Sequence, residues 1–586
     1  MTRERSEIDE EHKWDLKSVY SKEEEFEQDF ERLKELVKEL KGFEGQLSDA
    51  GKLLEFLKKY SQAGRKMSML SRYASMKSDQ DTRNQEAQAR KSRVQSLGTE
   101  MSRQLQFVDI EIQNIEDLES KFEEKAELEE YRHHLEDIKR GEKHTRSREV
   151  EETLSGLSDV LDASNEAYTM LSNADLEFPE VEKDGEKIKI SQANFTSLLQ
   201  KPDREFRRKV YEKYYDTITG FSNTIGSTLS KNVRRNVRMA EIKNFDTARK
   251  RALFSNKVPT EVYDQLVKEA RENADVVQRH AELKRKALDV DELGMHDLYM
   301  PVTEDESPEV SFEDAKEHII EAVAPLGEDY QEIVRKAFDE RWIDVYENKG
   351  KKSGAYSGGA YDTKSFILMN YQKDVNSMYT LAHELGHSVH SHLTKNNQNY
   401  LNSNYAIFVA EVASTVNEEL LTRHLLEEGD EKMRRHALDH SLENFRSTLF
   451  RQTMFAEFEK KIHETIESGE ALTSKKATEI YSELKNHYYA NADVDERIEK
   501  EWMRIPHFYY NFYVFQYATG ISAANALVDQ ILDEGPETYK EFLKKGGSDY
   551  PINLLREAGV EMETGEPVEA AIKRYRKRLD RAEKEL

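Results

Sequence analysis

Apolar residues recur at intervals of three and four positions through the first third of the chain, and charged residues fill the positions between them. The clearest run comprises Phe26, Phe30, Leu33, Leu36, Val37 and Leu40. This spacing lines one face of an α-helix with apolar side chains. Because no proline occurs before Pro179, we predict long helices that pack through these stripes into an amino-terminal lobe over residues 1–175.

The period of the pattern changes near residue 176. Two short runs of alternating character flank Asp184-Gly185, which predicts a β-hairpin with a tight turn. Asp203 then provides a start for the next helix. We therefore predict a hairpin and connector over residues 176–203, followed by a long, largely helical domain over residues 204–586.

Residues 350–371 are the least helical part of the second half. They open with a glycine-rich segment and continue as Phe366–Tyr371, a short apolar run typical of a strand. The glycines lack the ending of a phosphate-binding loop, so we interpret them as positions where another backbone approaches closely. The sequence of residues 297–308 is typical of a loop. Residues 573–586 are predicted to form a charged helix that contacts only solvent.

Composition narrows the class of protein. With 586 residues, 37% of them hydrophobic and 35% charged, the chain suits a large, helix-rich protein. It has no cysteine, which excludes thiolate catalysis and cysteine metal sites and favours a reducing compartment. The net charge of −27 argues against a nucleic-acid partner, because phosphate binding needs clustered Lys and Arg.

Nothing in the sequence indicates a membrane protein. The first residues lack the apolar segment of a secretory signal. No stretch approaches the roughly 18 uninterrupted apolar residues of a membrane span. We therefore expect a cytoplasmic protein without a membrane partner, and the oligomeric state stays unknown.

The segment Leu381–His390 contains the residues with recognisable chemistry. His383 and His387 are four positions apart, so on a helix both imidazoles lie on one face and can bind one ion. Two histidine nitrogens suit zinc, and a catalytic zinc needs one further protein ligand. Glu384 lies beside the first histidine, where it can accept a proton from water. Apolar flanks and a helix cap at Asp374 or Asn376 favour this interpretation over two unrelated histidines.

A third ligand has to come from elsewhere, because the third histidine of the metzincin pattern is absent. Glu411 is the lone charge in the apolar run Ala406–Ala413. A carboxylate there is costly to bury unless it is paired or bound to a metal. We therefore predict Glu411 as the third ligand. Glu418 and Glu419 lie in a more polar stretch and are expected at the surface or beside the ligands.

A second cluster of polar aromatic residues follows Pro506. Tyr510, Tyr513 and Tyr517 fall at i, i+3 and i+7, which predicts three hydroxyls on one helix face, with His507 one turn earlier. Such groups could stabilise a developing oxyanion. From the residues alone, an aromatic core helix is the alternative.

Four segments in this order resemble the M3 family of zinc metallopeptidases, in its oligoendopeptidase F branch. They are Asp344–Tyr356, Ala382–His390, Phe408–Thr415 and Pro506–Gly520. The resemblance extends over nearly the whole chain, since family members have a similar length and a helical amino-terminal lobe. The ordered set is far more specific than the HExxH string alone.

The resemblance implies a fold and an activity. The fold would be mainly α: a multi-helical, two-lobed body that encloses a deep substrate channel, with a small β-sheet beside the zinc helix. The strand at Phe366–Tyr371 would be the edge strand that binds an extended peptide through its main chain. The activity would be hydrolysis of internal bonds in short, unstructured peptides.

The resemblance also implies roles for the residues singled out above. One Zn2+ per chain would have three protein ligands, namely His383, His387 and Glu411. Glu384 would be the general base. The oxyanion or the substrate would be contacted by His507 and by one or more of Tyr510, Tyr513 and Tyr517.

Two other functions stay open at this stage. A helical HExxH carboxypeptidase would release single residues from the end of a peptide, whereas an endopeptidase would cut capped peptides internally. A helical scaffold or peptide-binding protein would bind no metal. Metal analysis separates that class from both peptidases.

Overall fold

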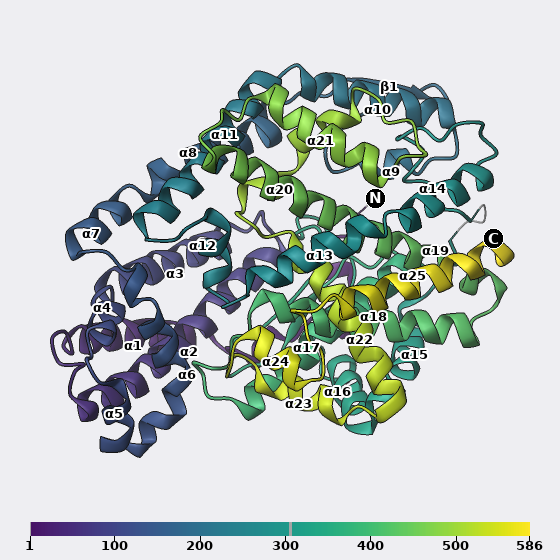
Figure 1. Cartoon of the computed structure of the whole chain (residues 1–586). Coiled ribbons are helices and arrows are strands. Elements are labelled where there is room, and N and C mark those ends of the chain that lie inside the picture. The colour runs from purple at the N-terminus through teal and green to yellow at the C-terminus, as the bar shows by residue number, and fades with distance from the viewer. Residues whose placement is uncertain (1, 304–306) are drawn as a thin grey trace. The chain divides into compact units, whose positions relative to one another are not determined.

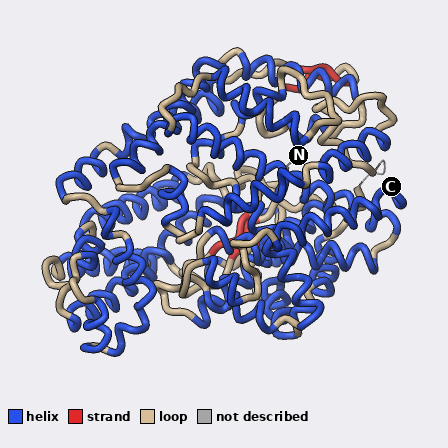
Figure 2. The backbone as a smooth tube through the Cα atoms, in the orientation of Figure 1, coloured by secondary structure: helices blue, strands red, loops and turns tan. Residues whose placement is uncertain are grey.

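The computed structural model describes residues 2–303 and 307–586, most of them in helices. Strands are confined to two short patches (Figure 2), so the prediction of a mainly α fold with a small sheet is confirmed. Among the described residues, no helix combines the length and the apolar character that crossing a membrane requires.

The chain forms two compact units, each built from three separate segments. Unit 1 comprises Met1–Lys143, Ser307–Leu425 and Leu527–Val560, and unit 2 comprises His144–Glu306, Leu426–Ala526 and Glu561–Leu586. The contiguous division at residues 1–175, 176–203 and 204–586 stays a prediction.

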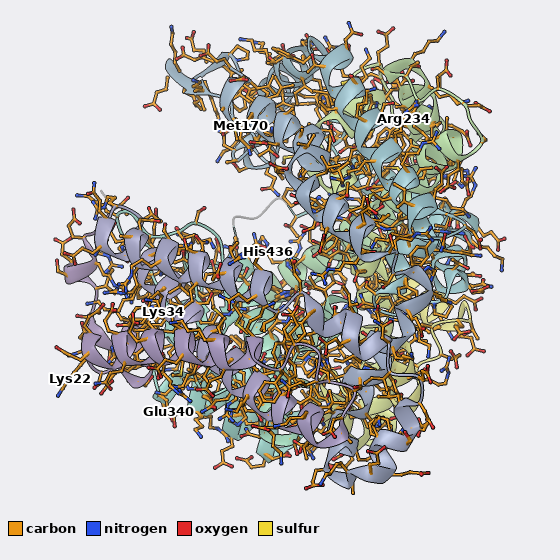
Figure 3. All side chains as sticks on the ribbon, turned by 90° about the vertical axis from the view of Figure 1, so that its left-hand side faces the viewer. Lys22, Lys34, Met170, Arg234, Glu340 and His436 are labelled. Atoms are coloured by element: carbon orange, nitrogen blue, oxygen red, sulfur yellow. The ribbon has the colours of Figure 1, made fainter. Side chains whose placement is uncertain are left out.

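Unit 1 begins with three long helices that pack together. They are α1 (Glu23–Lys41), α2 (Ala50–Gln80) and α3 (Gln85–Gln104) (Figure 1). All six residues of the predicted apolar stripe on α1 are buried. The charged residues between them include Lys34, labelled in Figure 3, which pairs with Glu31 at 2.6 Å. Burying one such apolar side chain stabilises the fold by about 1.5–3 kcal/mol, so packing fixes these helices, as predicted.

Unit 1 contains further helices from all three of its segments. They are α4 (Phe107–Gln113), α5 (Leu118–Glu124), α6 (Arg132–Arg140), α15 (Phe312–Ala322), α16 (Glu328–Asp339), α17 (Val375–Asn397), α18 (Ile407–Glu428), α23 (Glu537–Lys545) and α24 (Pro551–Glu557). Helices α18 and α22 (Phe515–Glu534) each continue from one unit into the other.

A three-stranded sheet lies against α17. Its strands are β3 (Ile343–Asp344), β4 (Tyr356–Gly358) and β5 (Phe366–Leu368), in the order β3-β5-β4. Strand β5 is parallel to β3 and antiparallel to β4. Phe366 and Leu368 reach into the core of the amino-terminal helices, so this core supports the sheet that stands beside the HExxH helix.

The strand within Phe366–Tyr371 forms, but its expected position at the sheet edge is wrong. The amide of Ile367 donates to the carbonyl of Trp342, just before β3, and the amide of Met369 donates to that of Asp344 in β3. On its other side β5 pairs with β4, where Ile367 lies opposite Ser357. Strand β5 is therefore central and β4 is an outer strand, and the peptide groups of Ser357 point away from the sheet. The apolar run marks a strand covered on both sides, whereas the edge strand is rich in serine and glycine.

Unit 2 contains the predicted hairpin. Strands β1 (Glu180–Lys183) and β2 (Glu186–Lys189) pair antiparallel. Asp184 and Gly185 both have positive φ, 53° and 83°, as a tight hairpin turn requires. Asp203 then caps α10 (Arg204–Thr219) by accepting the N–H of Phe206 at 3.0 Å. Both predictions are confirmed.

The other helices of unit 2 are mostly short to medium in length. They are α7 (Arg148–Gly156), α8 (Ser158–Met170), α9 (Phe195–Leu199), α11 (Ser222–Ile242), α12 (Ala248–Phe254), α13 (Thr260–Glu272), α14 (Asp275–Ala287), α19 (Glu431–Asn444), α20 (Gln452–Glu467), α21 (Ser474–Tyr488) and α25 (Glu566–Glu585). The loop predicted over 297–308 is confirmed where described; residues 304–306 lie outside the described residues.

The carboxyl-terminal helix packs against other helices of unit 2, which the sequence did not predict. Helix α25 packs against α13, α14 and α19 and buries Tyr575, Leu579 and Ala582. The hydroxyl of Tyr575 lies 2.7 Å from Nδ1 of His280. The expectation of a merely solvated tail was wrong, because its few apolar residues share one helix face beneath the charges.

Candidate metal centre

Helix α17 carries His383, Glu384 and His387. It begins after Asp374, whose carboxylate accepts the N–H of Ser377 at 2.7 Å, so Asp374 is the cap and Asn376 lies within the helix. The Nε2 atoms of the two histidines lie 3.1 Å apart. The four-residue spacing therefore brings both imidazoles to one point.

Helix α18 packs against α17 at very short range, and Gly386 makes this possible. A Cβ atom at this position would lie 2.6 Å from the carbonyl oxygen of Ala413 and 2.7 Å from the Cα of Ser414, so only glycine fits. The close packing carries Glu411 to the histidines. Its Oε2 lies 3.6 Å from Nε2 of His383.

The three predicted ligands fit a zinc ion. Ligand atoms of His383, His387 and Glu411 all lie within 4.8 Å of one another. Tetrahedral ligands at zinc distances are about 3.4 Å apart, and the separations of 3.1 Å and 3.6 Å bracket this value. Two imidazoles and one carboxylate also form a donor set typical of catalytic zinc, which leaves one position for water.

Glu418 orients the first histidine. Its Oε1 lies 2.9 Å from Nδ1 of His383, which directs Nε2 of the same ring toward His387 and Glu411. Such a carboxylate fixes the tautomer of a metal-binding histidine and raises its basicity. The sequence left Glu418 either at the surface or beside the ligands. Its position seven residues after Glu411, two turns along the same helix, is the signal that could have decided this.

Glu384 is buried next to the histidines, with 7% of its surface exposed. The pKa of Glu384 is raised to about 7, mainly by burial. The charge of His383 opposes this shift, and the charge of Glu411 adds to it. The backbone N–H of Ser357 on β4 also interacts with this carboxylate, and Oγ of Ser357 lies 2.8 Å from Oγ of Ser388. The edge strand is thus fixed beside a carboxyl group that can accept and return a proton near neutral pH.

The tyrosines in unit 2 do not share a helix face, so that prediction was wrong. Pro506–Tyr509 form a 3₁₀ turn, and α22 begins only at Phe515. Between them, Asn511 and Phe512 have φ of 51° and 57°. Two consecutive residues in the left-handed region interrupt any helix, and the i, i+3, i+7 spacing cannot reveal them.

The tyrosines nevertheless gather around one imidazole. The ring centroid of His507 lies 5.6 Å, 6.2 Å and 6.1 Å from those of Tyr510, Tyr513 and Tyr517 respectively. Tyr510 is half exposed. Burial lowers the pKa of His507, and Arg451 lowers it further, so the imidazole is largely neutral at pH 7.

A buried carboxyl group holds the loop that carries this cluster. Glu459 accepts the N–H of Phe512 through Oε1 at 2.6 Å. Burial raises the pKa of Glu459 to about 8, so the group is largely protonated at neutral pH. The sequence could not identify this residue, because its role depends on a backbone amide more than fifty positions away.

Two histidines and a glutamate from consecutive helices, with a buried glutamate beside them, define the class of HExxH metallopeptidases. Comparison with known proteins identifies the family. The chain belongs to peptidase family M3: the model described as "Peptidase family M3" matches residues 197–574, and the model described as "Oligopeptidase F" matches residues 113–178.

Relatives extend the match over the whole chain. Oligopeptidase PepF of Bacillus subtilis is 43% identical over 99% of this chain and 88% of that protein. Group B oligopeptidase PepB of Streptococcus agalactiae is 40% identical over 99% of this chain and 98% of that protein. The crystal structure of oligoendopeptidase-F from Enterococcus faecium is 35% identical, with a TM-score of 0.75 over 96% of this chain and 99% of that chain. The chain is therefore a metalloendopeptidase, and the resemblance is confirmed.

Proposed function

We propose that this metalloendopeptidase uses one zinc ion per chain to hydrolyse internal bonds of short, unstructured peptides. The observation that carries the proposal is the convergence of His383, His387 and Glu411 at separations suited to zinc. The names of the relatives, oligopeptidase and oligoendopeptidase, support the substrate class. The absence of cysteine supports a reducing compartment such as the cytoplasm.

Glu384 acts as the general base in the proposed reaction. A bound zinc ion supplies a Lewis acid that activates water and polarises the scissile carbonyl. The Glu384 carboxylate accepts a proton from the attacking water and passes it to the nitrogen of the leaving amine. Burial raises the pKa of Glu384, which makes its carboxylate a stronger base than that of a solvent-exposed glutamate. Glu418 keeps His383 in the required orientation throughout.

Strand β4 binds the substrate main chain in this proposal. The peptide groups of Ser357 point away from the sheet and lie next to Glu384. An extended peptide can add to this edge as a further strand, with main-chain hydrogen bonds that do not depend on its sequence. Such pairing favours unstructured peptides, because a folded protein does not offer a free strand.

The proposal is tested with a quenched-fluorescent peptide that is capped at both ends. We expect cleavage at an internal bond, seen by mass spectrometry of the products. A zinc chelator should lower the rate by at least about 100-fold, since the Lewis acid is removed, and one equivalent of zinc should restore it. Activity that resists the chelator, or release of single carboxyl-terminal residues only, would contradict the proposal.

We also propose that His507 and one of the three tyrosines stabilise the oxyanion. The family motif and the grouping of the rings around His507 support this role. If one hydroxyl donates to the oxyanion, its Tyr→Phe variant should lose about 100- to 1000-fold in kcat with little change in KM.

The three variants to compare in kcat and KM are Tyr510→Phe, Tyr513→Phe and Tyr517→Phe. Tyr509→Phe is the matched control, because that buried hydroxyl pairs with Thr228 at 2.7 Å. If all three variants keep their kcat within about twofold of the wild type, no tyrosine of this cluster stabilises the oxyanion.

A further inference from the structure

A cavity of about 240 Å³ in unit 1 lies between β4 and the far end of α17. Its lining includes Arg72, Ser357, Gly358, Gly359, Ser391 and Lys395. No aspartate or glutamate of the described chain lines it, although the protein has a net charge of −27. Two cations and several hydroxyls therefore line a cavity without any acidic partner.

Lys395 has no partner for its charge in this cavity. Its Nζ is buried and makes no hydrogen bond to any described residue. Burial and the charge of Arg72 lower the pKa of Lys395 to about 8, against the opposing effect of Asp362, so the amine is still mostly charged at pH 7. Asp362 is occupied by Arg65, whose Nε donates to Oδ2 at 2.8 Å. An unpaired buried cation is costly and points to a missing anion.

Gly358 at the end of β4 and the following Gly359 lie close to both cations. A Cβ atom at Gly359 would lie 3.1 Å from Nζ of Lys395, and one at Gly358 would lie 3.2 Å from Nη1 of Arg72. A side chain at Gly359 would clash with the carbonyl oxygen of Lys364 and crowd Lys395, and one at Gly358 would crowd Arg72. The two cations therefore lie directly beside the strand proposed to bind the substrate.

We propose that this cavity binds a carboxylate of the substrate peptide, with Lys395 and Arg72 as its charged partners. The inference rests on the proposed function and adds a specificity determinant to it. Two cations form the short, charge-assisted hydrogen bonds that carboxylates accept best. Ser391 and Tyr405 add a further donor, because their hydroxyls share one hydrogen bond of 2.8 Å and one O–H stays available.

The position of Lys395 on α17 sets its distance from the cleaved bond. Glu384, Ser388, Ser391 and Lys395 fall at spacings of four, three and four, so they form one stripe along the helix. Eleven residues span about 16 Å, and the lysine side chain leans back toward the amino end. An extended peptide advances about 3.4 Å per residue. The carboxylate should therefore lie about three to five residues from the scissile bond.

The dimensions favour a peptide over a free inorganic anion. A larger cavity of about 810 Å³ adjoins the first one and shares Ser68, Arg72, Tyr400 and Asn404 with it. Together they leave room for several residues of chain, far more than a small ion fills. Ser357 and Gly358 of β4 line the cavity, so a peptide beside the outer edge of this strand would reach it.

Strand direction decides which carboxylate is bound. A peptide antiparallel to β4 brings its amino-terminal half past Gly359, so the group would be an Asp or Glu side chain. A parallel peptide brings its carboxyl-terminal half there, so the group would be the terminal carboxylate. The two sources share the same chemistry and are separated by the choice of peptide.

The test uses three quenched-fluorescent peptides with one common core. The first is neutral and amidated, the second has a glutamate three to five residues before the cut, and the third ends in a free carboxylate at that distance after it. For wild type we expect a kcat/KM about 10- to 100-fold higher for the second or third peptide than for the first. In Lys395→Met this preference should vanish while the neutral peptide is cut within about twofold of the wild-type rate.

Lys336→Met is the matched control. It removes an equal charge from α16, which packs on α17, and Lys336 does not line the cavity. It should keep the full preference. Equal rates for all three peptides in wild type, or an unchanged preference in Lys395→Met, would overturn the inference. Binding of inorganic phosphate is measured in parallel. If phosphate binding requires Lys395 but no peptide is preferred, the cavity binds small anions and the inference is overturned.

A second readout separates this inference from the proposed function. Fluorescence anisotropy of the labelled peptides on Glu384→Gln protein measures binding without turnover. Tighter binding of a carboxylate peptide that is lost in Glu384→Gln/Lys395→Met supports the inference even if no peptide is cleaved. Equal binding contradicts it even if cleavage is zinc-dependent. The melting temperature of Lys395→Met should not fall, because an unpaired buried charge is removed.

Discussion

Replacing Glu384 by Gln should lower kcat by about 1000-fold while the protein still binds one zinc ion. The amide keeps the size of the side chain but cannot accept a proton from water. None of the three proposed ligands changes, so their separations of 3.1 Å and 3.6 Å are preserved. The measurement is kcat on a capped internal peptide, together with zinc content by mass spectrometry.

The control for this variant is Glu313→Gln, which removes one exposed carboxylate from α15 in the same unit. It should keep full activity. A Glu384→Gln enzyme with more than about a tenth of the wild-type kcat would show that another group accepts the proton. Loss of zinc from the variant would instead indicate that Glu384 helps to hold the metal.

Substitution of Glu411 should remove zinc far more effectively than substitution of Glu418. Both carboxylates lie on α18 near His383, at 3.6 Å from Nε2 and 2.9 Å from Nδ1 respectively. Glu418→Ala removes a partner that only orients the ring, which should weaken zinc binding about 10- to 100-fold. Glu411→Ala removes a proposed ligand, so dialysed protein should contain much less than one zinc per chain.

Excess zinc distinguishes the two roles in activity. It should restore most of the activity of Glu418→Ala, because all three proposed ligands are intact. It should not restore Glu411→Ala, whose site has lost one of them. Zinc affinities measured with a competing chelator give the same comparison without catalysis. The reverse pattern would exchange the roles of the two glutamates.

The parts of the site that follow from local geometry were predictable from the sequence. The pairing of His383 with His387 needs only one regular helix, and Glu411 was recognisable because an isolated charge in an apolar run is costly. The helices with clear apolar stripes, such as α1, were equally accessible. These predictions depend on the chain within a few turns of the residue concerned.

The parts that depend on distant contacts were not predictable. Asn511 and Phe512 adopt positive φ next to the buried Glu459, and no local pattern distinguishes this from a continuing helix. Lys395 lies near the carboxyl end of α17, where a lysine ordinarily stabilises the helix dipole. Only β4, folded back against α17, shows that its Nζ is buried in a cavity.

The interleaving of the two units has a consequence for synthesis of the protein. The chain passes from one unit to the other after residues 143, 306, 425, 526 and 560, and unit 1 is complete only with Leu527–Val560. The HExxH helix is therefore translated well before α23, which packs on it through a hydrogen bond from Thr394 to the carbonyl of Leu543. During synthesis, apolar faces of unit 1 therefore stay exposed until Val560 is made, and those of unit 2 until the segment Glu561–Leu586 is made. Truncation cannot release either half as an independent fragment.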